Sequence, residues 1–471
     1  IPPRPERLKY PPLTYDAPVP AEYRVELKSG PVAYVVPDEE LPLVNVLVYV
    51  RAGQYLVPAG KEGLADLAGY LLARGGTKTK TAEELEERLA FLAAQLNSSV
   101  AETQGSVSLN LLSKDLDEGF AVLREVLAAP RFQDDKIALR KDQMFQDMKQ
   151  RNDESAAIEA RERGFLAFGD EFFANRYPTE ASVKGISNAD LEGFHKRWFH
   201  PEQFVVAVSG DFERAEMVAR LEKLFADWPH KGEQAPAVPT EAAFAKPGVY
   251  VVDKDVNQGR VSVMLPGITR DDPDYFPVLV MNDILGGGGF TSRITNRVRS
   301  DEGLAYSASS TFPGGVYYPL PFRAGFQSKS RSVAYATSVV LEEIRKIASD
   351  PVTAEELNTA RKSFTETFPR NFATKAQIAT TFAQDELTGR YARDPEFWKN
   401  YRKRIEAVSS ADVQRVARKF LAPDKLVILI IGKKSDIVAG DLKHDVKLES
   451  LAGNQVVDVP LRDPLTMQPL R

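Results

Sequence analysis

Hydrophobic and polar positions follow one another along the chain in two similar series, and each series predicts a set of strands and helices. Short apolar runs bounded by Gly, Pro or Asp are typical of buried strands, whereas apolar spacings of three and four residues are typical of amphipathic helices. Each series ends with a serine-capped helix, a turn marked by proline and an apolar strand that closes on glycine. The predicted strands are Tyr23–Leu27, Val32–Val36, Val44–Arg51, Ser106–Leu112 and Phe204–Ser209 in the first series, and Val249–Asp253, Val261–Leu265, Leu304–Thr311, Phe322–Lys329 and Leu426–Ile431 in the second.

The two series are related by an internal repeat. The segment Ile186–Leu191 (ISNADL) matches Val408–Val413 (VSSADV) 222 positions later. A second pair of segments repeats at a separation of 221, each with a proline followed ten and eleven residues later by Arg-Lys. Agreement of independent segments on nearly one offset indicates two homologous domains. The matched single residues are Pro201 and Pro423, Gly210 and Gly432, Pro130 and Pro351, Arg140 and Arg361, and Lys141 and Lys362.

Within each repeat, hairpin-like strand pairs are separated from helical stretches, which predicts an α+β fold. We expect two homologous α/β sandwich domains, each a mostly antiparallel sheet with helices packed on it, joined by a short linker. Prolines interrupt the periodicity between the repeats, and regular patterning fades after about residue 436. The expected boundaries are an extended N-terminal arm (1–22), a first domain (23–230), a linker (231–248), a second domain (249–436) and a C-terminal tail on the surface (437–471).

Composition excludes several classes of function. The 61 basic and 66 acidic residues nearly cancel, which argues against a dedicated nucleic-acid-binding protein. The apolar runs at 41–50 and 426–431 are far shorter than the ~20 residues that a membrane span needs, so we expect no membrane span.

The absence of cysteine excludes disulfides, thiolate nucleophiles and cysteine-based metal sites. The chain starts at Ile1 with a proline-rich stretch, which favours a removed signal peptide and a periplasmic or otherwise exported bacterial protein.

Ordered motifs along both repeats carry a family resemblance. In the first, an apolar strand ends in Arg51-Ala52-Gly53, a helix covers residues 63–72, Gly75-Gly76-Thr77 follows, and a second helix begins at Thr81. In the second, Ile284-Leu285-Gly286-Gly287-Gly288-Gly289-Phe290-Thr291-Ser292-Arg293 precedes Val298-Arg299 and Gly303-Leu304-Ala305-Tyr306-Ser307. This series resembles the pitrilysin-like zinc peptidases (inverzincins), the group that contains mitochondrial processing peptidase and its bacterial relatives. The resemblance covers roughly residues 23–436.

The resemblance breaks at the zinc motif. Active members carry HxxEH on the first helix, where two imidazoles four residues apart hold zinc and the glutamate activates water. The matching positions here read Asp66-Leu67-Ala68-Gly69-Tyr70, so both histidine positions (Asp66 and Tyr70) and the general-base position (Gly69) are changed. By spacing, the third ligand of the family falls near Gln146–Asp147, and one aspartate there does not complete a set. We therefore expect no metal site and no cofactor in this chain.

The few histidines offer no replacement for the lost ligands. His195 and His200 lie five residues apart with Glu202 nearby, which is a conceivable ligand set. However, the pattern places His195 inside the last helix of the first repeat and His200 in the turn before its strand. We interpret both as structural residues.

The other half of the family's active site is retained. In paired-domain members an Arg and, seven residues later, a Tyr donate hydrogen bonds to the scissile carbonyl and its developing oxyanion, and Arg299 and Tyr306 have this spacing. A guanidinium and a phenol are both donors suited to that role. We expect Thr291 or Ser292 to cap a helix that runs to about Asp301, with Tyr306 at the start of the next strand. Without the surrounding motif, both residues would be interpreted as ordinary surface residues.

The glycine run, Gly286, Gly287, Gly288 and Gly289, has two interpretations. A phosphate-binding loop would need a following Lys-Ser/Thr pair and a parallel strand–loop–helix unit, and neither is present. We therefore interpret the run as a flexible, substrate-binding loop near the interface, similar to the glycine-rich loop of the processing peptidase's non-catalytic subunit.

Two hypotheses for function follow. The resemblance implies a non-catalytic subunit of a heteromeric zinc metallopeptidase, in which a homologous HxxEH-bearing partner supplies zinc and this chain supplies Arg299 and Tyr306 for peptide hydrolysis. The assembly would be a heterodimer or larger, its substrate a peptide, and the chain inactive alone. The alternative is a catalytically inert pseudo-peptidase that binds peptides or acts as a scaffold. Self-sufficient hydrolysis lacks a nucleophile or a metal set.

Overall fold

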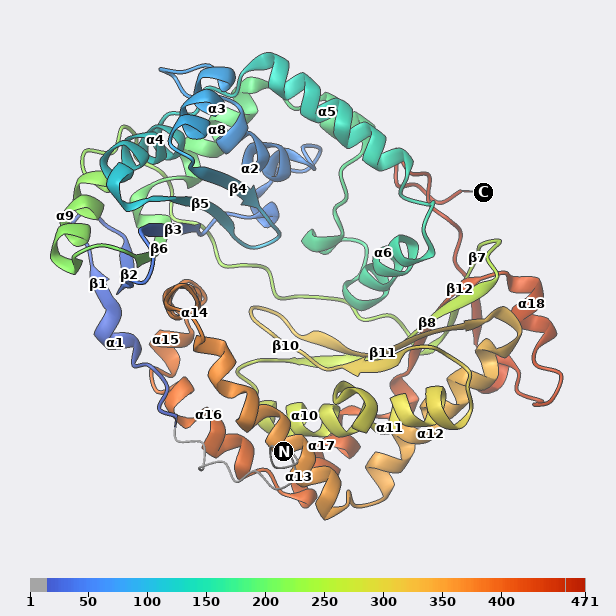
Figure 1. Cartoon of the computed structure of the whole chain (residues 1–471). Helices are drawn as coiled ribbons and strands as arrows, with labels where there is room; N and C mark the ends of the chain where they lie inside the picture. The colour runs from blue at the N-terminus through green and yellow to red at the C-terminus, as the bar shows by residue number, and fades with distance from the viewer. Residues whose placement is uncertain (1–14, 454, 471) are drawn as a thin grey trace, which may run out of the picture.

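The computed structural model describes residues 15–453 and 455–470, which fold into two mixed β-sheets with helices packed against them (Figure 1). The predicted α+β class with two similar sandwich-like halves is confirmed. The N-terminal arm lies largely outside the described residues. Its described part packs on the second half, where the ring of Tyr15 meets that of Phe368 edge-on at 6.0 Å between centroids.

The first sheet has the strand order β1-β2-β6-β3-β5-β4. Strands β2 and β6 are parallel and every other neighbouring pair is antiparallel. The bounds of its strands are β1 Arg24–Glu26, β2 Val32–Pro37, β3 Leu43–Val50, β4 Gln95–Val100, β5 Gly105–Leu112 and β6 Phe204–Gly210. The helices of this part of the chain are α1 Pro20–Tyr23, α2 Leu64–Arg74, α3 Ala82–Phe91, α4 Leu116–Ala128, α5 Asp134–Lys149, α6 Ser155–Phe168, α7 Glu180–Lys184, α8 Asn188–Trp198 and α9 Arg214–Phe225.

The second sheet has the order β13-β7-β12-β8-β11-β9, with the short strand β10 beside β8. Its strands are β7 Gly248–Asp253, β8 Gln258–Thr269, β9 Ala308–Thr311, β10 Gly314–Gly315, β11 Leu320–Lys329, β12 Val427–Gly432 and β13 Val456–Asp458. Its helices are α10 Tyr275–Asn282, α11 Arg293–Thr295, α12 Val333–Ser349, α13 Ala354–Thr367, α14 Lys375–Leu387, α15 Arg390–Arg393, α16 Phe397–Glu406, α17 Ser410–Phe420 and α18 Lys434–Ala439, with π-helical turns η6 Asp283–Gly287 and η8 Asn296–Asp301.

The two sheets share one topology. Strands β2, β6, β3, β5 and β4 correspond in order and direction to β7, β12, β8, β11 and β9. In both series the first pair, β2–β6 and β7–β12, is parallel and the following pairs are antiparallel. The repeated helix start is also conserved in detail: Ser187 and Ser409 each form a capping box with an aspartate three residues later. The sequence repeat is therefore a repeat of structure.

Each half covers one face of the other half's sheet. Helix α14, from the second half of the chain, packs on β6 and β2, and helix α6, from the first half, packs on β12 and β8 (Figure 1). Strands β6 and β12 are consequently buried at every residue, because each has helices on both faces. A carboxylate of α14 joins the two halves: Glu386 accepts hydrogen bonds from Arg24 at 2.9 and 3.1 Å and from the Tyr34 hydroxyl at 2.9 Å.

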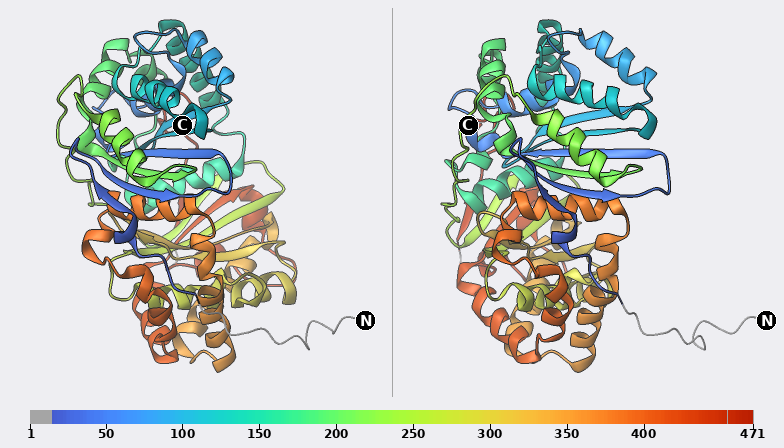
Figure 2. Two further views of the ribbon diagram at one scale, coloured as in Figure 1. Left: turned by 60° about the vertical axis from the view of Figure 1, so that its left-hand side comes forward. Right: turned by 90° about the vertical axis from the view of Figure 1, so that its left-hand side faces the viewer.

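The C-terminal segment is more regular than the tail that we expected. Strand β13 pairs in parallel with β7 and extends the second sheet, while Leu448 and Leu451 are buried in the second core. Beyond β13 the chain returns to the first half, where the Leu465 carbonyl accepts from the Glu180 amide at 2.9 Å. Widely spaced hydrophobic side chains attach this segment to the core, and it lacks the continuous hydrophobic pattern that would have predicted its structure. Figure 2 shows how closely the two halves adjoin when viewed from the side.

The ten predicted strands all occur, with ends shifted by a few residues, but the prediction missed β4 and the short strands β10 and β13, and it misplaced the start of β9. Strand β4 reads Gln-Leu-Asn-Ser-Ser-Val, with few apolar residues, because it is the edge strand of its sheet. Strand β9 begins at Ala308 rather than at Leu304. No helix in the described ranges has the length and apolar character that a membrane crossing requires.

Candidate functional site

The altered zinc motif lies on helix α2, which packs beside the edge strand β4. Asp66 is exposed, Gly69 is buried and Tyr70 is partly buried. Helix α2 begins after Gly63, whose φ of 101° is in the left-handed region where glycine is favoured. The three positions lie on one helix, α2, as the resemblance implied.

Gly69 allows the closest contact between α2 and β4. A Cβ atom at Gly69 would lie 2.2 Å from the backbone nitrogen of Val100, so no side chain fits there without moving the strand. The Ser98 hydroxyl bridges the same contact, since it donates to the Gly69 carbonyl at 2.5 Å and accepts from the Ala73 amide at 2.9 Å. A glutamate at position 69, as in the active members of the family, would therefore clash with strand β4 as it is packed here.

Arg140 of α5 occupies the face of α2 where Asp66 and Tyr70 point. Its guanidinium pairs with the Asp66 carboxylate at 3.2 Å and lies 4.4 Å from the centre of the Tyr70 ring. Arg74 lies over the same ring at 4.7 Å. In the sequence, Arg140 is recognisable only as one residue of the internal repeat, because α5 follows α2 by some sixty residues and no local pattern indicates their contact.

This arrangement does not suit a divalent cation. The Arg140 guanidinium pairs with the one carboxylate and the Arg74 guanidinium lies over the Tyr70 ring, so a cation there would meet like charges in place of ligands. Asp147, the candidate for the distal ligand, is exposed on α5, two turns beyond Arg140. Across the described residues, no group of three or more His, Cys, Asp or Glu could hold a metal ion.

Two histidines that we interpreted as structural bond backbone carbonyls. Nε2 of His195 lies 2.8 Å from the Leu127 carbonyl oxygen, and burial lowers the pKa of His195 to about 3. Nε2 of His200 lies 3.0 Å from the Glu233 carbonyl oxygen. A buried imidazole that is bonded to the main chain supports packing.

Arg299 and Tyr306 lie together at the surface of the second half. The guanidinium carbon of Arg299 is 4.6 Å from the centre of the Tyr306 ring and 4.6 Å from that of Phe290, so two aromatic rings contact it. Tyr306 and Phe290 are 84% and 67% exposed. Within the described chain, neither the Arg299 guanidinium nor the Tyr306 hydroxyl has a hydrogen-bond or ion-pair partner. Their donors are consequently free for a ligand.

The local backbone differs from our expectation. The segment forms the short helix α11 followed by the π-helical turn η8, which contains Arg299, rather than one regular helix. Ser292 does not cap it by accepting a hydrogen bond; its hydroxyl donates to the Gly289 carbonyl at 2.7 Å and to Thr295 at 2.9 Å. Gly303, with φ of 61°, ends the turn, and Tyr306 lies two residues before β9.

The glycine run forms helical turns rather than the loose loop that we expected. Gly286 and Gly287 end the π-helical turn η6, and Gly289 begins a 3₁₀ turn with φ of 62°. Gly286 is buried against the edge strand β9, where a Cβ would lie 2.6 Å from the Ser310 amide nitrogen. Gly287 and Gly288 are likewise crowded by Asn282 and Asp283, so the run serves close packing.

Gly286 and Gly69 have the same structural role in the two halves. Each brings a helical turn against the backbone of the strand at the edge of its sheet, β9 and β4. Phe290, for which we predicted no role, follows the glycine run, and the Arg299 guanidinium lies over its ring. The signal in the sequence was an aromatic residue directly after four glycines.

Comparisons with known proteins agree with this architecture. Residues 34–167 match the family described as insulinase (peptidase family M16), and residues 185–364 match the M16 inactive domain. An uncharacterized zinc protease of Mycobacterium leprae is 28% identical over 70% of this chain and 74% of its own length. The non-peptidase homolog YmxG of Helicobacter pylori is 27% identical (73% and 79%), and a probable mitochondrial-processing peptidase subunit beta of Arabidopsis thaliana is 22% identical (83% and 75%).

Solved structures show the same fold. The M16 inactive domain from Pseudomonas fluorescens superimposes with a TM-score of 0.77 at 23% identity, covering 87% of this chain and 97% of that one. The periplasmic protease PqqL of Escherichia coli gives 0.72 at 14% identity, covering 90% of this chain and 47% of that one. With its duplicated sheets, its helix α2 beside an edge strand and these matches along most of its length, the chain belongs to peptidase family M16.

Proposed function

We propose that this chain is the non-catalytic member of a two-chain zinc metallopeptidase. A homologous partner would carry HxxEH and zinc, and this chain would contribute Arg299 and Tyr306 to the binding of the substrate peptide. The observation that carries the proposal is the contrast between the two half-sites. One exposes two donors that have no partner among the described residues. In the other, Arg140 contacts the residues at both histidine positions and a close-packed glycine stands at the general-base position.

The chemistry of the exposed pair suits a developing negative charge. The Phe290 and Tyr306 rings contact the Arg299 guanidinium, so its N–H groups, which lie in the plane of the group, remain available to an oxygen acceptor. The Tyr306 hydroxyl is a second donor on the same surface. Donors held in place before the reaction stabilise an oxyanion more than the carbonyl from which it forms.

The relatives support both parts of the proposal. One relative is described as a non-peptidase homolog and another as a processing-peptidase subunit, so non-catalytic and subunit roles occur among similar chains. The matched description of residues 185–364 as an inactive domain is consistent with a supporting role for the second half.

A tagged pull-down from native extract tests the proposal. We expect an HxxEH-bearing chain to co-purify, and the eluate to show peptidase activity that a chelator abolishes and zinc restores. The chain purified alone should show neither stoichiometric zinc nor hydrolysis. Recovery of the chain without such a partner, inert and metal-free, would instead establish the alternative of a peptide-binding or scaffolding pseudo-peptidase.

We further propose an exported, periplasmic location. The similarity in fold to the periplasmic PqqL supports it, and the cysteine-free composition is compatible with an oxidising compartment. Osmotic-shock fractionation of the native cells would release the chain with periplasmic markers. Retention with the cytoplasmic markers would exclude this location.

A further inference from the structure

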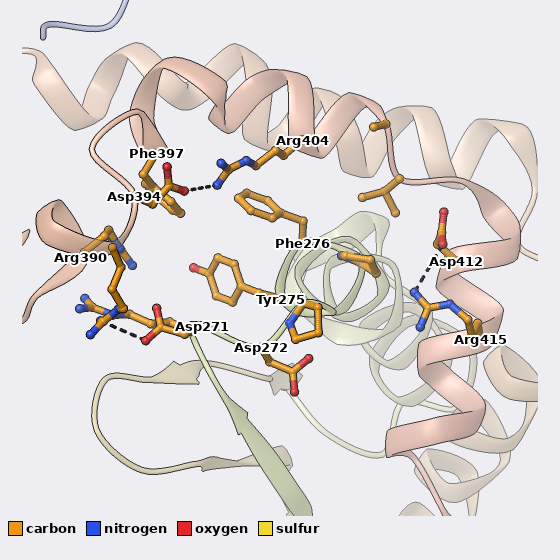
Figure 3. A pocket seen from close by; sticks show the side chains of 16 residues that line it. Asp271, Asp272, Tyr275, Phe276, Arg390, Asp394, Phe397, Arg404, Asp412 and Arg415 are labelled. Carbon is orange, nitrogen blue, oxygen red and sulfur yellow. Dashed lines mark hydrogen bonds and ion pairs between the residues drawn. The ribbon is translucent and has the colours of Figure 1, made fainter.

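A cavity of about 680 Å³ lies in the outer helical layer of the second half, between α10, α16 and α17 (Figure 3). It is far from Arg299 and Tyr306. Ala308, two residues after Tyr306, is joined through Phe326 to Val261 of β8, and the cavity begins at Arg270, nine residues further along. At 3.3 Å per residue this separation is about 30 Å.

Five arginines and four aspartates line the cavity, and among the described residues all of them except Arg270 and Asp272 form ion pairs. Arg393 pairs with Asp271 at 3.0 Å, Arg404 with Asp394 at 2.5 Å and Arg390 with Asp385 at 3.2 Å. Arg415 pairs with Asp274 at 2.7 Å and with Asp412 at 3.4 Å. Four of the five lining arginines therefore have a carboxylate partner.

Arg270 is the exception. It is 92% buried, and no carboxylate of the described chain lies within ion-pair distance. Its Nη2 donates to the Thr388 carbonyl at 2.8 Å, at the C-terminus of α14, but its Nε has no acceptor. Burial lowers the pKa of Arg270, and the like charge of Arg390 lowers it further. A buried guanidinium without a counter-ion is unfavourable unless an anion completes its surroundings.

Arg270 is held in place by its backbone. Its amide donates to the Gly315 carbonyl at 2.8 Å, where β10 adds to the end of β8. A Cβ at Gly314 would lie 2.6 Å from the Arg270 Cα, so the two strands meet as closely as glycine permits. The cation is therefore positioned by two strands and is not on a mobile loop.

The rest of the cavity wall separates into a polar and an aromatic part. The Tyr275 hydroxyl has no hydrogen-bond partner in the described chain and points toward Arg390 in Figure 3. Phe276 and Phe397 face each other at 5.9 Å between ring centroids and form an apolar wall. Unused donors beside an apolar wall, in a cavity of this size, are typical of small-ligand sites.

We propose that this cavity binds a small organic anion, with its carboxylate or phosphate group at Arg270 and Tyr275 and an aromatic or apolar body against Phe276 and Phe397. The acid group supplies the counter-ion and acceptor that Arg270 lacks. The rings remove the ligand's apolar surface from water. The site is independent of the proposed peptidase role.

Calorimetric titration of the purified full chain tests the proposal with defined probes: 3-phenylpropionate, phenyl phosphate, the neutral 3-phenylpropan-1-ol and inorganic phosphate. We expect one-to-one binding of at least one of the two aromatic acids, with the alcohol and inorganic phosphate at least tenfold weaker. The tighter of the two acids identifies the head group. Equal affinity for acid and alcohol, equal affinity for phenyl phosphate and inorganic phosphate, or no saturable binding of either acid would overturn the proposal.

Variants then assign the binding to the named residues. Arg270→Met should weaken the acids at least tenfold and Tyr275→Phe at least threefold, while Arg418→Met, on the exposed side of α17, should change nothing. If Arg270→Met fails to fold, judged by circular dichroism, Tyr275→Phe and the probe series still decide. Unchanged affinity in Tyr275→Phe and in every folded Arg270 variant would refute the site.

Discussion

The Arg299 guanidinium carbon lies 4.6 Å from the centre of the Tyr306 ring, although a π-helical turn and a bend separate the two residues in the chain. The phenol therefore has two uses at once. Its ring contacts the Arg299 guanidinium, while its hydroxyl has no hydrogen-bond partner in the described part of the chain and can donate to a ligand.

We predict that loss of either donor lowers turnover in the assembled peptidase. Arg299→Ala or Tyr306→Phe should reduce kcat by roughly 10²–10³-fold with a smaller change in KM, because the lost bond acts mainly in the transition state. Steady-state kinetics of the co-purified complex measure this effect. Arg345→Ala, which removes an exposed arginine from α12, is the matched control. Unchanged turnover in both donor variants would remove the assigned role.

Phe290 should matter through Arg299. An exposed cation–π contact is worth about 0.5–1 kcal/mol, so Phe290→Ala should lower kcat/KM about two- to fivefold, and Phe290→Tyr should preserve it. Phe91→Ala is a close control, because the exposed Phe91 ring lies 4.9 Å from the Arg88 guanidinium in the first half. A Phe290→Ala effect that persists in the Arg299→Ala background would contradict a positioning role.

Gly69→Ala should destabilise the fold. The new methyl group would overlap the Val100 backbone, and forced displacement of a packed strand costs about 1–3 kcal/mol. Gly193→Ala, at an exposed position inside α8 with open space around it, should instead stabilise by about 0.5–1 kcal/mol. Urea unfolding of both variants makes the comparison. Equal stability of the two variants would mean that β4 yields without cost.

Asp283, at the start of the turn that carries the glycine run, should make stability depend on pH. Burial raises its pKa to about 6, in a cavity of about 340 Å³ also lined by Glu355 and Glu356. The folded state then binds more protons than the unfolded state between about pH 4 and pH 6, so the free energy of unfolding falls as pH rises through this window and is level above it. Part of the side chain is solvated, which limits the effect to about 1–2 kcal/mol.

The substitution Asp283→Asn isolates this contribution. The amide carries no charge, so the variant should gain about 1–2 kcal/mol over the wild type at pH 7 and nothing at pH 4. Denaturant unfolding at both pH values measures the difference. A gain of the same size at pH 4 and pH 7 would show that titration of Asp283 is not its source.

The sequence predicted most of the fold because strong local signals mark it. Strands β6 and β12 are apolar runs rich in β-branched residues, and the Ser187 and Ser409 caps can each be recognised from four residues. Strand β4 was missed because an edge strand with one solvated face needs few apolar residues.

Only part of the candidate site could be predicted from the sequence. The changed zinc positions and the spacing of Arg299 and Tyr306 stand in the sequence itself. By contrast, the contact of Arg140 with Tyr70 depends on how α5 crosses α2, and the π-helical turn η6 is packed against β9. Nothing local in the sequence specifies either of these.

The exchange of α6 and α14 bears on how the molecule forms. Neither half buries its own sheet without a helix from the other, so a cut between residues 231 and 248 would leave each fragment with an uncovered apolar face. The chain should therefore unfold in a single cooperative transition despite its duplicated ancestry. Its two halves, expressed as separate polypeptides, should become stable only after they are mixed and bind each other.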